Sequence, residues 1–380
     1  PIPQRAGGAP AGSLRNLTPA ATAPFNRPPR PGRPPAPEPI EPPSPLEVPP
    51  PTKFSLLTIA APLVMAAVLV IVLKDLRFAL FSLMSPIMAL GAYFEQKRRR
   101  KKNLEEEETR FTKALSDFRA EIVEAAAVET VRRQDMIPDP AVVMRRPSLP
   151  STLMWQRRST SHDFLSLHIG VANEPWQPEL DMRGIGKLDE RTKAVLEASS
   201  LTAAPVMADL NDAGVIGIVG DREGALALAR SLVIQAATHC GPADLTIGAF
   251  CDTGREAAWD WMAWLPHTRQ AGGGPAARWL SSQRDTSMSM LRSMVDSLGG
   301  LPTPAMLVVL DSEVLTEGRD APARDLLGAG RPVPGVSERG EQRKVSGIVI
   351  ASAPDQLPAA CTTIVHIGQD AAATVQNPEE

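Results

Sequence analysis

The sequence has few cysteines, few histidines and little net charge, and each scarcity excludes a class of protein. Three cysteines (Cys240, Cys251 and Cys361) cannot form a fully paired disulfide scaffold, so we expect reduced thiols in a cytosolic compartment. The 5 histidines form no HExxH motif and the cysteines no CxxC motif, which leaves a zinc site without support. A net charge of −3 over 380 residues is too small to indicate a polyanionic partner for the whole chain.

Motifs for nucleophilic or phosphate chemistry are also missing. No GxSxG occurs, and no Gly-Lys is followed by Ser or Thr. The best candidate phosphate loop is the stretch 215–224, a strand, a glycine turn and a helix, with the candidate residues Gly217, Gly220, Asp221 and Gly224. Because Asp221 and Glu223 would repel ATP there, we interpret Gly220 as a tight turn and Asp221 as a helix cap; a working nucleotide site remains the alternative.

Asp311 is the second candidate. It ends the apolar run Leu307-Val308-Val309-Leu310, as does the acid that holds Mg²⁺ in a nucleoside triphosphatase. Without the lysine loop, we expect Asp311 to be a turn-forming cap. The sequence therefore predicts no catalytic residue, no metal site and no confident cofactor site.

The residues that are abundant lie in separate blocks. Of the 38 prolines, 18 fall between Pro1 and Pro51, and we expect 1–53 to be a disordered, partly polyproline II tail. A ligand for a proline-binding module is the functional alternative. The chain begins at Pro1 rather than at Met, so we expect its native start to be missing and its end to be cut as well.

Two apolar runs follow the tail. Residues 54–73 and 78–94 carry no charge and reach roughly 30 and 25 Å as helices, about the thickness of a bilayer core. They predict a two-helix membrane hairpin, with two buried core helices as the soluble alternative. The cations at 97–102 place the following chain, and hence both termini, on the cytoplasmic side of the cell membrane. The same basic run could also contact nucleic acid or anionic lipid.

Good helix formers without Gly or Pro fill the segment from Leu104 to Arg133, and we predict a cytoplasmic stalk helix over 95–135. One face carries an apolar seam made of Leu104, Phe111, Leu115, Phe118, Ile122 and Ala125. We expect the seam to pack on a neighbouring helix. Self-association or docking on a membrane partner follows only if that neighbour belongs to another chain.

Residues 136–380 predict a mainly parallel α/β sheet domain, because apolar runs alternate with helical stretches. The predicted strands are 164–169, 215–219, 245–250, 306–310, 348–351 and 363–367; the predicted helices are 189–199, 224–240, 256–265 and 286–298. Segments 271–275 and 317–344 are predicted loops or insertions. The tryptophan-rich stretch 259–267 is expected to pack against the sheet, with an exposed interaction surface as the alternative.

Several blocks carry a family resemblance: 153–158 (LMWQRR), 163–170 (DFLSLHIG), 215–221 (VIGIVGD), 229–233 (ARSLV), 241–245 (GPADL) and 259–267 (WDWMAWLPH). With the hairpin and stalk, the sequence from Phe54 onward resembles the N-terminal part of the EccC family, the membrane-anchored FtsK/SpoIIIE-like ATPases of actinobacterial type VII (ESX) secretion systems. The block WDWMAWLPH is the most specific element of the likeness.

The resemblance implies a core subunit of a protein-secretion machine. Its hairpin and stalk would pack on other membrane subunits, within an assembly that holds several copies of the chain. The α/β domain would be a degenerate P-loop/RecA-like module without cofactor, while ATP, Mg²⁺ and the secreted substrates would bind in further domains. Two rivals remain: an FtsK-like DNA translocase, disfavoured because the basic run is confined to the membrane edge, and a nucleotide-sensing membrane protein.

Overall fold

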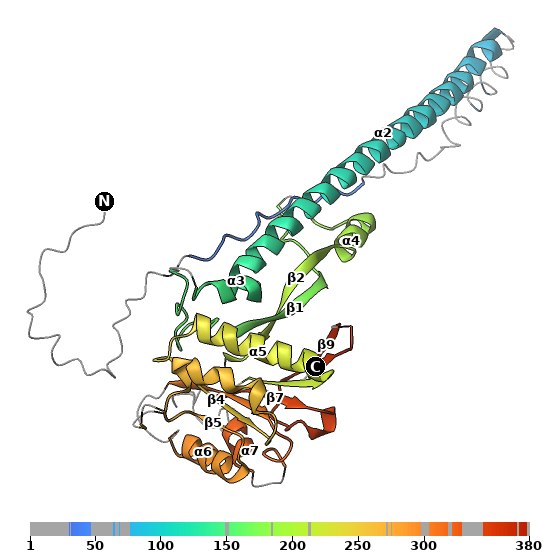
Figure 1. Ribbon diagram of the computed structural model, residues 1–380. Helices are drawn as coiled ribbons and strands as arrows, with labels where there is room; N and C mark the ends of the chain where they lie inside the picture. Colours follow the sequence, from blue (N-terminus) through green and yellow to red (C-terminus); the bar gives the residue numbers. More distant parts are fainter. Residues whose placement is uncertain are drawn as a thin grey trace, which may run out of the picture. The chain divides into compact units, whose positions relative to one another are not determined.

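The computed structural model describes residues 30, 32–46, 64, 68, 77–148, 152–183, 185–211, 214–270, 273–274, 276–297, 304–317, 321–328, 345–370 and 372–377, without the side chains of 77–87, 89 and 90. The chain divides into two compact units (Figure 1). The α/β unit takes in residues 132–172 and 203–380 together with the chain up to Pro34. The stalk unit takes in 35–131 and 173–202.

A seven-stranded sheet is the centre of the α/β unit. Its strands, in spatial order, are β5 (Leu280–Ser281), β4 (Leu245–Cys251), β6 (Ala305–Asp311), β7 (Val345–Ala351), β3 (Val215–Gly220), β8 (Thr363–Ile367) and β9 (Ala373–Gln376). Every neighbouring pair is parallel except β8 and β9, which are antiparallel. The predicted mainly parallel sheet is thereby confirmed.

Alternate residues of the strands enter two hydrophobic cores, one on each face of the sheet. On β6, Leu307 and Val309 pack with α5 (Arg222–His239), whereas Val308 and Leu310 pack with α6 (Arg284–Ser297) and α7 (Pro322–Gly328). Figure 1 shows α5 on one side of the sheet and α6 and α7 on the other. Both faces are covered, which explains the almost uninterrupted apolar sequence of the strands.

The stalk unit is built on α2 (Arg77–Met136), a single helix of 60 residues. The Leu115–Ala125 part of the predicted apolar seam packs within the same chain: Phe118 and Ile122 contact Val195 and Leu196 of α4 (Glu190–Glu197). The seam therefore has an intramolecular partner. A two-stranded sheet of β1 (Ser166–Pro175) and β2 (Ser200–Asp209) flanks α4 in the sequence.

Part of the proline-rich segment is ordered, in contrast to the tail predicted over 1–53. Ile40 is 7% exposed and lies in the core of the stalk unit. Its N–H donates to the carbonyl of Glu179 at 2.9 Å, and its own carbonyl accepts from the N–H of Asp181 at 2.9 Å. Composition predicted disorder because apolar side chains are rare here, but Ile40 with its two backbone hydrogen bonds, together with the buried Pro42 and Pro43, docks this part of the segment.

The membrane hairpin receives no support from the described residues, among which no helix combines the length and apolar character needed to cross a bilayer. The predicted first span, 54–73, lies outside them except for Val64 and Val68. The predicted second span, 78–94, is the beginning of α2, which continues without a break through the predicted stalk. Helix α2 ends at Met136, just before the predicted stop at Pro138, and Pro140 begins α3 (Pro140–Arg145).

Other differences have local causes. The segment predicted as one α-helix over 256–265 forms two 3₁₀ turns, η3 (Glu256–Ala258) and η4 (Asp260–Trp264), and a third, η5 (Pro266–Thr268), follows it. The predicted insertion 317–344 contains α7, and the short strands β5 and β9 lack the apolar run that marks an interior strand. A further 3₁₀ turn, η6 (Pro354–Gln356), precedes β8. The three cysteines are free, as expected, and all three are buried.

Candidate functional site

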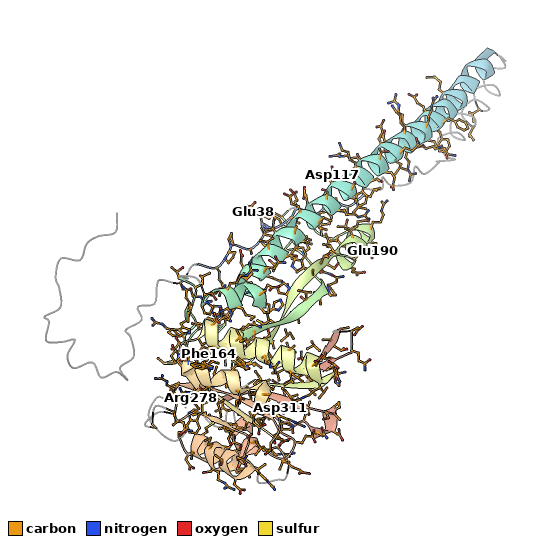
Figure 2. All side chains as sticks on the ribbon, viewed as in Figure 1. Glu38, Asp117, Phe164, Glu190, Arg278 and Asp311 are labelled. Atoms are coloured by element: carbon orange, nitrogen blue, oxygen red, sulfur yellow. The ribbon has the colours of Figure 1, made fainter. Side chains whose placement is uncertain are left out.

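The carboxylate of Asp311 is completely buried at the end of β6 (Figure 2). Its Oδ1 accepts hydrogen bonds from Arg222 Nη1 at 2.7 Å and Arg255 Nη1 at 3.1 Å. Its Oδ2 accepts from Arg222 Nη2 at 2.6 Å and from the indole N–H of Trp259 at 2.9 Å. Because a carboxylate offers about four lone pairs, these donors saturate it. We call the four residues the Asp311 cluster.

The topology of the sheet brings the cluster together. Arg222 is the first residue of α5, directly after the turn that follows β3, and β7 lies between β3 and β6. The two-point contact from Arg222 to Asp311 therefore spans the carboxyl end of the intervening strand. Arg255 and Trp259 come from the segment after β4. In open parallel sheets, ligands usually bind at this edge.

A looser ring of polar groups surrounds the cluster. Arg255 Nη1 lies 3.5 Å from Asp252 Oδ2, and its Nη2 lies 3.6 Å from Glu313 Oε1. Asp252 also accepts a hydrogen bond from the hydroxyl of Ser312. These outer pairs are partly exposed and contribute little. The contacts to Asp311 matter more, because the carboxylate has no exposed surface and removing its donors would leave a buried charge without compensation.

The glycine turn before α5 uses its donors within the protein. Gly220 has φ +109°, and a Cβ there would lie 2.1 Å from the carbonyl oxygen of Ile367, so only glycine fits. The N–H of Asp221 donates to that carbonyl at 2.9 Å, and the N–H of Gly224 donates to Asp221 Oδ2 at 2.8 Å. Two amides that would face a phosphate in a nucleotide-binding loop are thus already bonded.

Two sequence predictions are decided by this geometry. Asp221 caps α5, as predicted. The prediction that Asp311 is a turn-forming cap is wrong: its side chain accepts from two arginines and an indole. Gly217 packs against Leu357, because a Cβ there would lie 2.6 Å from Leu357 Cδ1. Among the described residues, no three His, Cys, Asp or Glu side chains converge as metal ligands would.

The blocks LMWQRR and WDWMAWLPH meet at the C-terminal end of α5. The backbone N–H and the indole N–H of Trp155 donate to the carbonyls of Thr238 and Ala237, at 2.8 and 2.9 Å. His267 Nε2 donates to the carbonyl of Cys240 at 2.9 Å, and the rings of His267 and Trp155 meet edge to face, 6.1 Å apart. Backbone and side-chain donors of Trp155 thus satisfy carbonyls in the last turn of α5, and His267 satisfies that of the C-cap residue Cys240.

The tryptophans of 259–267 have different surroundings. Trp259 is 4% exposed and belongs to the Asp311 cluster, whereas Trp264 is 90% exposed. The predicted packing against the sheet therefore holds for Trp259 and not for Trp264. The sequence indicated the aromatic residues, but it gave no indication that Trp259 serves as a hydrogen-bond donor to Asp311.

Burial alters two titratable groups of this region. It lowers the pKa of His267 to about 4, against 6.5 for an ordinary histidine, although the bond to Cys240 opposes the shift. Burial, together with the nearby Asp311, raises the pKa of the Cys251 thiol to about 11. At neutral pH, His267 is therefore a neutral donor and Cys251 an uncharged thiol.

No protein-family model matches the sequence. The ESX-4 secretion system protein EccC4 of Mycobacterium tuberculosis is 29% identical over 163 residues, 41% of this chain and 13% of that protein. The ESX-3 secretion system protein EccC3 of Mycobacterium tuberculosis is 26% identical over 235 residues, 57% of this chain and 17% of that protein. The type VII secretion system protein EssC of Staphylococcus aureus is 23% identical over 229 residues, which is 57% of this chain and 15% of that protein.

The chain is similar to the EccC and EssC proteins of type VII secretion systems. Its matches span 13% to 17% of the length of these relatives. Two solved structures were also found, each 15% identical in sequence. Thermomonospora curvata EccC (ATPases 2 and 3) with a signal sequence peptide has a TM-score of 0.31, and the match covers 44% of this chain and 32% of that chain. Geobacillus thermodenitrificans EssC (ATPases 2 and 3) has a TM-score of 0.37, and the match covers 57% of this chain and 39% of that chain. Scores this low do not establish a shared fold, so the relationship depends on the sequence matches.

Sequence reasoning missed the two arginines of the EccC-like α/β unit. Arg222 lies inside the stretch 215–224, where the carboxylates of Asp221 and Glu223 argued against a phosphate site. Arg255 lies in a turn that contains no motif. The signal for Arg222 was its place at the start of the helix after a glycine turn, where a cation can reach the end of a neighbouring strand. No local signal indicates Arg255, because its partner is 56 residues away.

Replacing His267 with glutamine should reduce the loss of unfolding free energy that the protein suffers as the pH falls. Because the folded-state pKa of His267 is about 4 and the ordinary value is 6.5, the unfolded chain binds a proton first as the pH falls. The wild type should lose up to about 3 kcal/mol from this residue between about pH 6.5 and about pH 4. Glutamine keeps a donor for the Cys240 carbonyl without titrating.

The measurement is the free energy of unfolding of both proteins by denaturant across that pH range. His239 is also buried, with a pKa well below its ordinary value, but it titrates in both proteins and cancels in the difference. Parallel pH profiles for the wild type and His267→Gln would contradict the prediction.

Proposed function

We propose that the chain is a membrane-anchored core component of a type VII protein-secretion machine. In this proposal its α/β unit is a coupling module that neither binds nor hydrolyses ATP. Motor domains outside this chain bind ATP and Mg²⁺ and act on the secreted proteins. The similarity to EccC4, EccC3 and EssC supports the secretion role.

The Asp311 cluster is the observation that carries the non-catalytic role. At the position where an acid would hold Mg²⁺, Asp311 has no lone pair left for a metal ion, because two arginines and an indole use them. The glycine turn beside it donates to Ile367 and Asp221 instead of to a phosphate. Together these contacts favour a degenerate P-loop/RecA-like module.

The charges beside the proposed membrane edge disfavour the DNA translocase. Arg99 bonds Glu95 at 2.6 Å, and Lys101 and Lys102 lie 3.7 and 3.4 Å from Glu105 and Glu106. These pairs are exposed and individually weak, but they place an acid beside half of the basic run. A duplex-DNA motor needs many free cations along its contact surface.

Membrane anchoring is proposed from the sequence. Segments 54–73 and 78–94 carry no charge and are followed by the basic run 97–102, which favours two spans with both termini in the cytoplasm. We further propose that the hairpin contacts other membrane subunits and that several copies of the chain assemble together. The intramolecular burial of the stalk seam leaves the hairpin as the main candidate for these contacts.

Mg²⁺-ATP at millimolar concentration should leave the melting temperature of the purified full chain unchanged. The reason is that ligand binding to the folded state raises the melting temperature, and the Asp311 cluster offers no site. The melting temperature would be measured by thermal unfolding in neutral detergent and compared with the value in Mg²⁺ alone. A saturable rise with ATP would contradict the proposal and favour a nucleotide sensor, whereas salt-dependent binding of duplex DNA would favour the translocase.

The tagged full chain, expressed in its own organism, should stay in the membrane fraction after an alkaline carbonate wash and co-purify with other integral membrane proteins. The double variant Met65→Arg/Leu69→Arg should be extracted, because two arginines inside a span cost about 6 kcal/mol. Its matched control, Pro51→Arg/Thr52→Arg, adds the same charge before the span and should behave as the wild type. Extraction of the wild type by carbonate would contradict the proposed anchor.

A further inference from the structure

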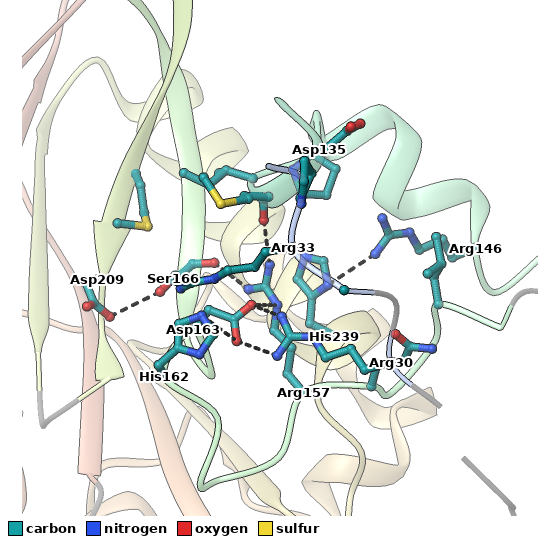
Figure 3. A pocket seen from close by; sticks show the side chains of 18 residues that line it. Arg30, Arg33, Asp135, Arg146, Arg157, His162, Asp163, Ser166, Asp209 and His239 are labelled. Carbon is teal, nitrogen blue, oxygen red and sulfur yellow. Dashed lines mark hydrogen bonds and ion pairs between the residues drawn. The ribbon is translucent and has the colours of Figure 1, made fainter. Parts of the chain in front are cut away.

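The α/β unit holds a second charged site, separate from the Asp311 cluster. It is a pocket with a volume of about 500 Å³, and no member of the Asp311 cluster lines it. Four arginines contribute to its wall: Arg30, Arg33, Arg146 and Arg157. We call it the arginine pocket. Figure 3 shows Arg30 and Arg157 converging on Asp163, and Arg146 directed toward His239.

Two of the four arginines, Arg30 and Arg157, share one carboxylate, that of Asp163. Arg30 contacts Asp163 through both terminal nitrogens, with Nη1 at 2.8 Å from Oδ1. Arg157 is 5% exposed, its Nε lies 3.3 Å from Asp163 Oδ2, and its Nη1 donates to the carbonyl of Ser166 at 2.6 Å. Asp163 is thereby screened by two guanidinium groups and offers little repulsion to an anion in the pocket.

Arg146 is half-buried and lacks a carboxylate partner among the described residues. Its Nη1 lies 3.3 Å from Nδ1 of His239, and its Nε is buried without a hydrogen-bond partner there. Burial lowers the pKa of Arg146, and burial keeps His239 neutral, so the histidine accepts from the arginine but supplies no charge. A desolvated cation without a counter-charge is costly.

Arg33 adds a second unpaired cation to the wall. It is exposed, and the described residues give it no ion pair, although Asp135 and Asp209 also line the pocket. Apolar side chains complete the lining, among them Met136, Leu153 and Met207. The pocket thus combines two available guanidinium groups with an apolar wall, the usual character of a site for a small organic anion.

We propose that the arginine pocket binds a phosphate ester, with the phosphate oxygens on Arg146 and Arg33 and the organic part against the apolar wall. Guanidinium groups bind tetrahedral oxyanions by charge-assisted, two-point hydrogen bonds. A phosphate supplies acceptors for the orphan Nε of Arg146 and the counter-charge that His239 lacks. The volume of about 500 Å³ leaves room for more than an inorganic ion. A soluble phosphate ester and a phospholipid headgroup share this chemistry.

The test is the melting temperature and calorimetric titration of the full chain with inorganic phosphate and with glycerol 3-phosphate, at constant ionic strength. Glycerol 3-phosphate should bind saturably, and Arg146→Gln should weaken it about tenfold or more. Arg145→Gln is the matched control, because Arg145 is the preceding, exposed arginine and does not line the pocket. Arg146→Gln without ligand should melt no lower than the wild type, since it removes an unpaired buried charge.

Vesicles distinguish the two sources of the phosphate. If phosphatidylglycerol vesicles bind the chain more weakly after Arg146→Gln than after Arg145→Gln, the occupant is a lipid headgroup. If the two variants bind vesicles equally and differ only with glycerol 3-phosphate, the occupant is a soluble ester. Phosphatidylcholine vesicles, which carry no net charge, serve as the control for binding that does not depend on the charge of the lipid. Absence of saturable binding by the wild type, or equal affinities of the two variants for every probe, would overturn the proposal.

Discussion

The buried carboxylate of Asp311 is the constraint on which the carboxyl edge of the sheet depends. A charge with no exposed surface persists only when every acceptor position is filled, and here Arg222, Arg255 and Trp259 fill them. Those donors tie together the start of α5, the turn after β4 and the tryptophan-rich segment. The same contacts occupy the carboxyl edge of the sheet, where ligands usually bind in open parallel sheets.

The conspicuous sequence blocks therefore serve the fold of the α/β unit. Trp259 anchors Asp311, while Trp155 and His267 close the C-terminal end of α5. Helix α5 is thus fixed at its start by Arg222 and at its end by two aromatic rings.

Local patterns predicted much of the sheet and little of the site. The strands and α5 follow from apolar runs and helix formers, and the turn at Gly220 and the cap at Asp221 follow from residue types that suit those conformations. The role of Asp311 could not be predicted, because its partners are 89 and 56 residues away in the sequence. Ile40 was missed for a similar reason: composition describes a whole segment, whereas Ile40 is buried because it meets a core formed by residues far away in the sequence.

The most direct test of the central claim is a double-mutant cycle between Arg222 and Asp311. The free energies of unfolding of Asp311→Asn, Arg222→Met, the double variant and the wild type would be measured by denaturant titration at neutral pH. If the ion pair between Arg222 and the buried Asp311 organises the carboxyl edge, the two changes should be coupled, with an interaction energy of about 2 kcal/mol. The reason is that the first substitution already breaks the pair, so the second has no pair left to remove. Additive effects within about 0.5 kcal/mol would contradict it.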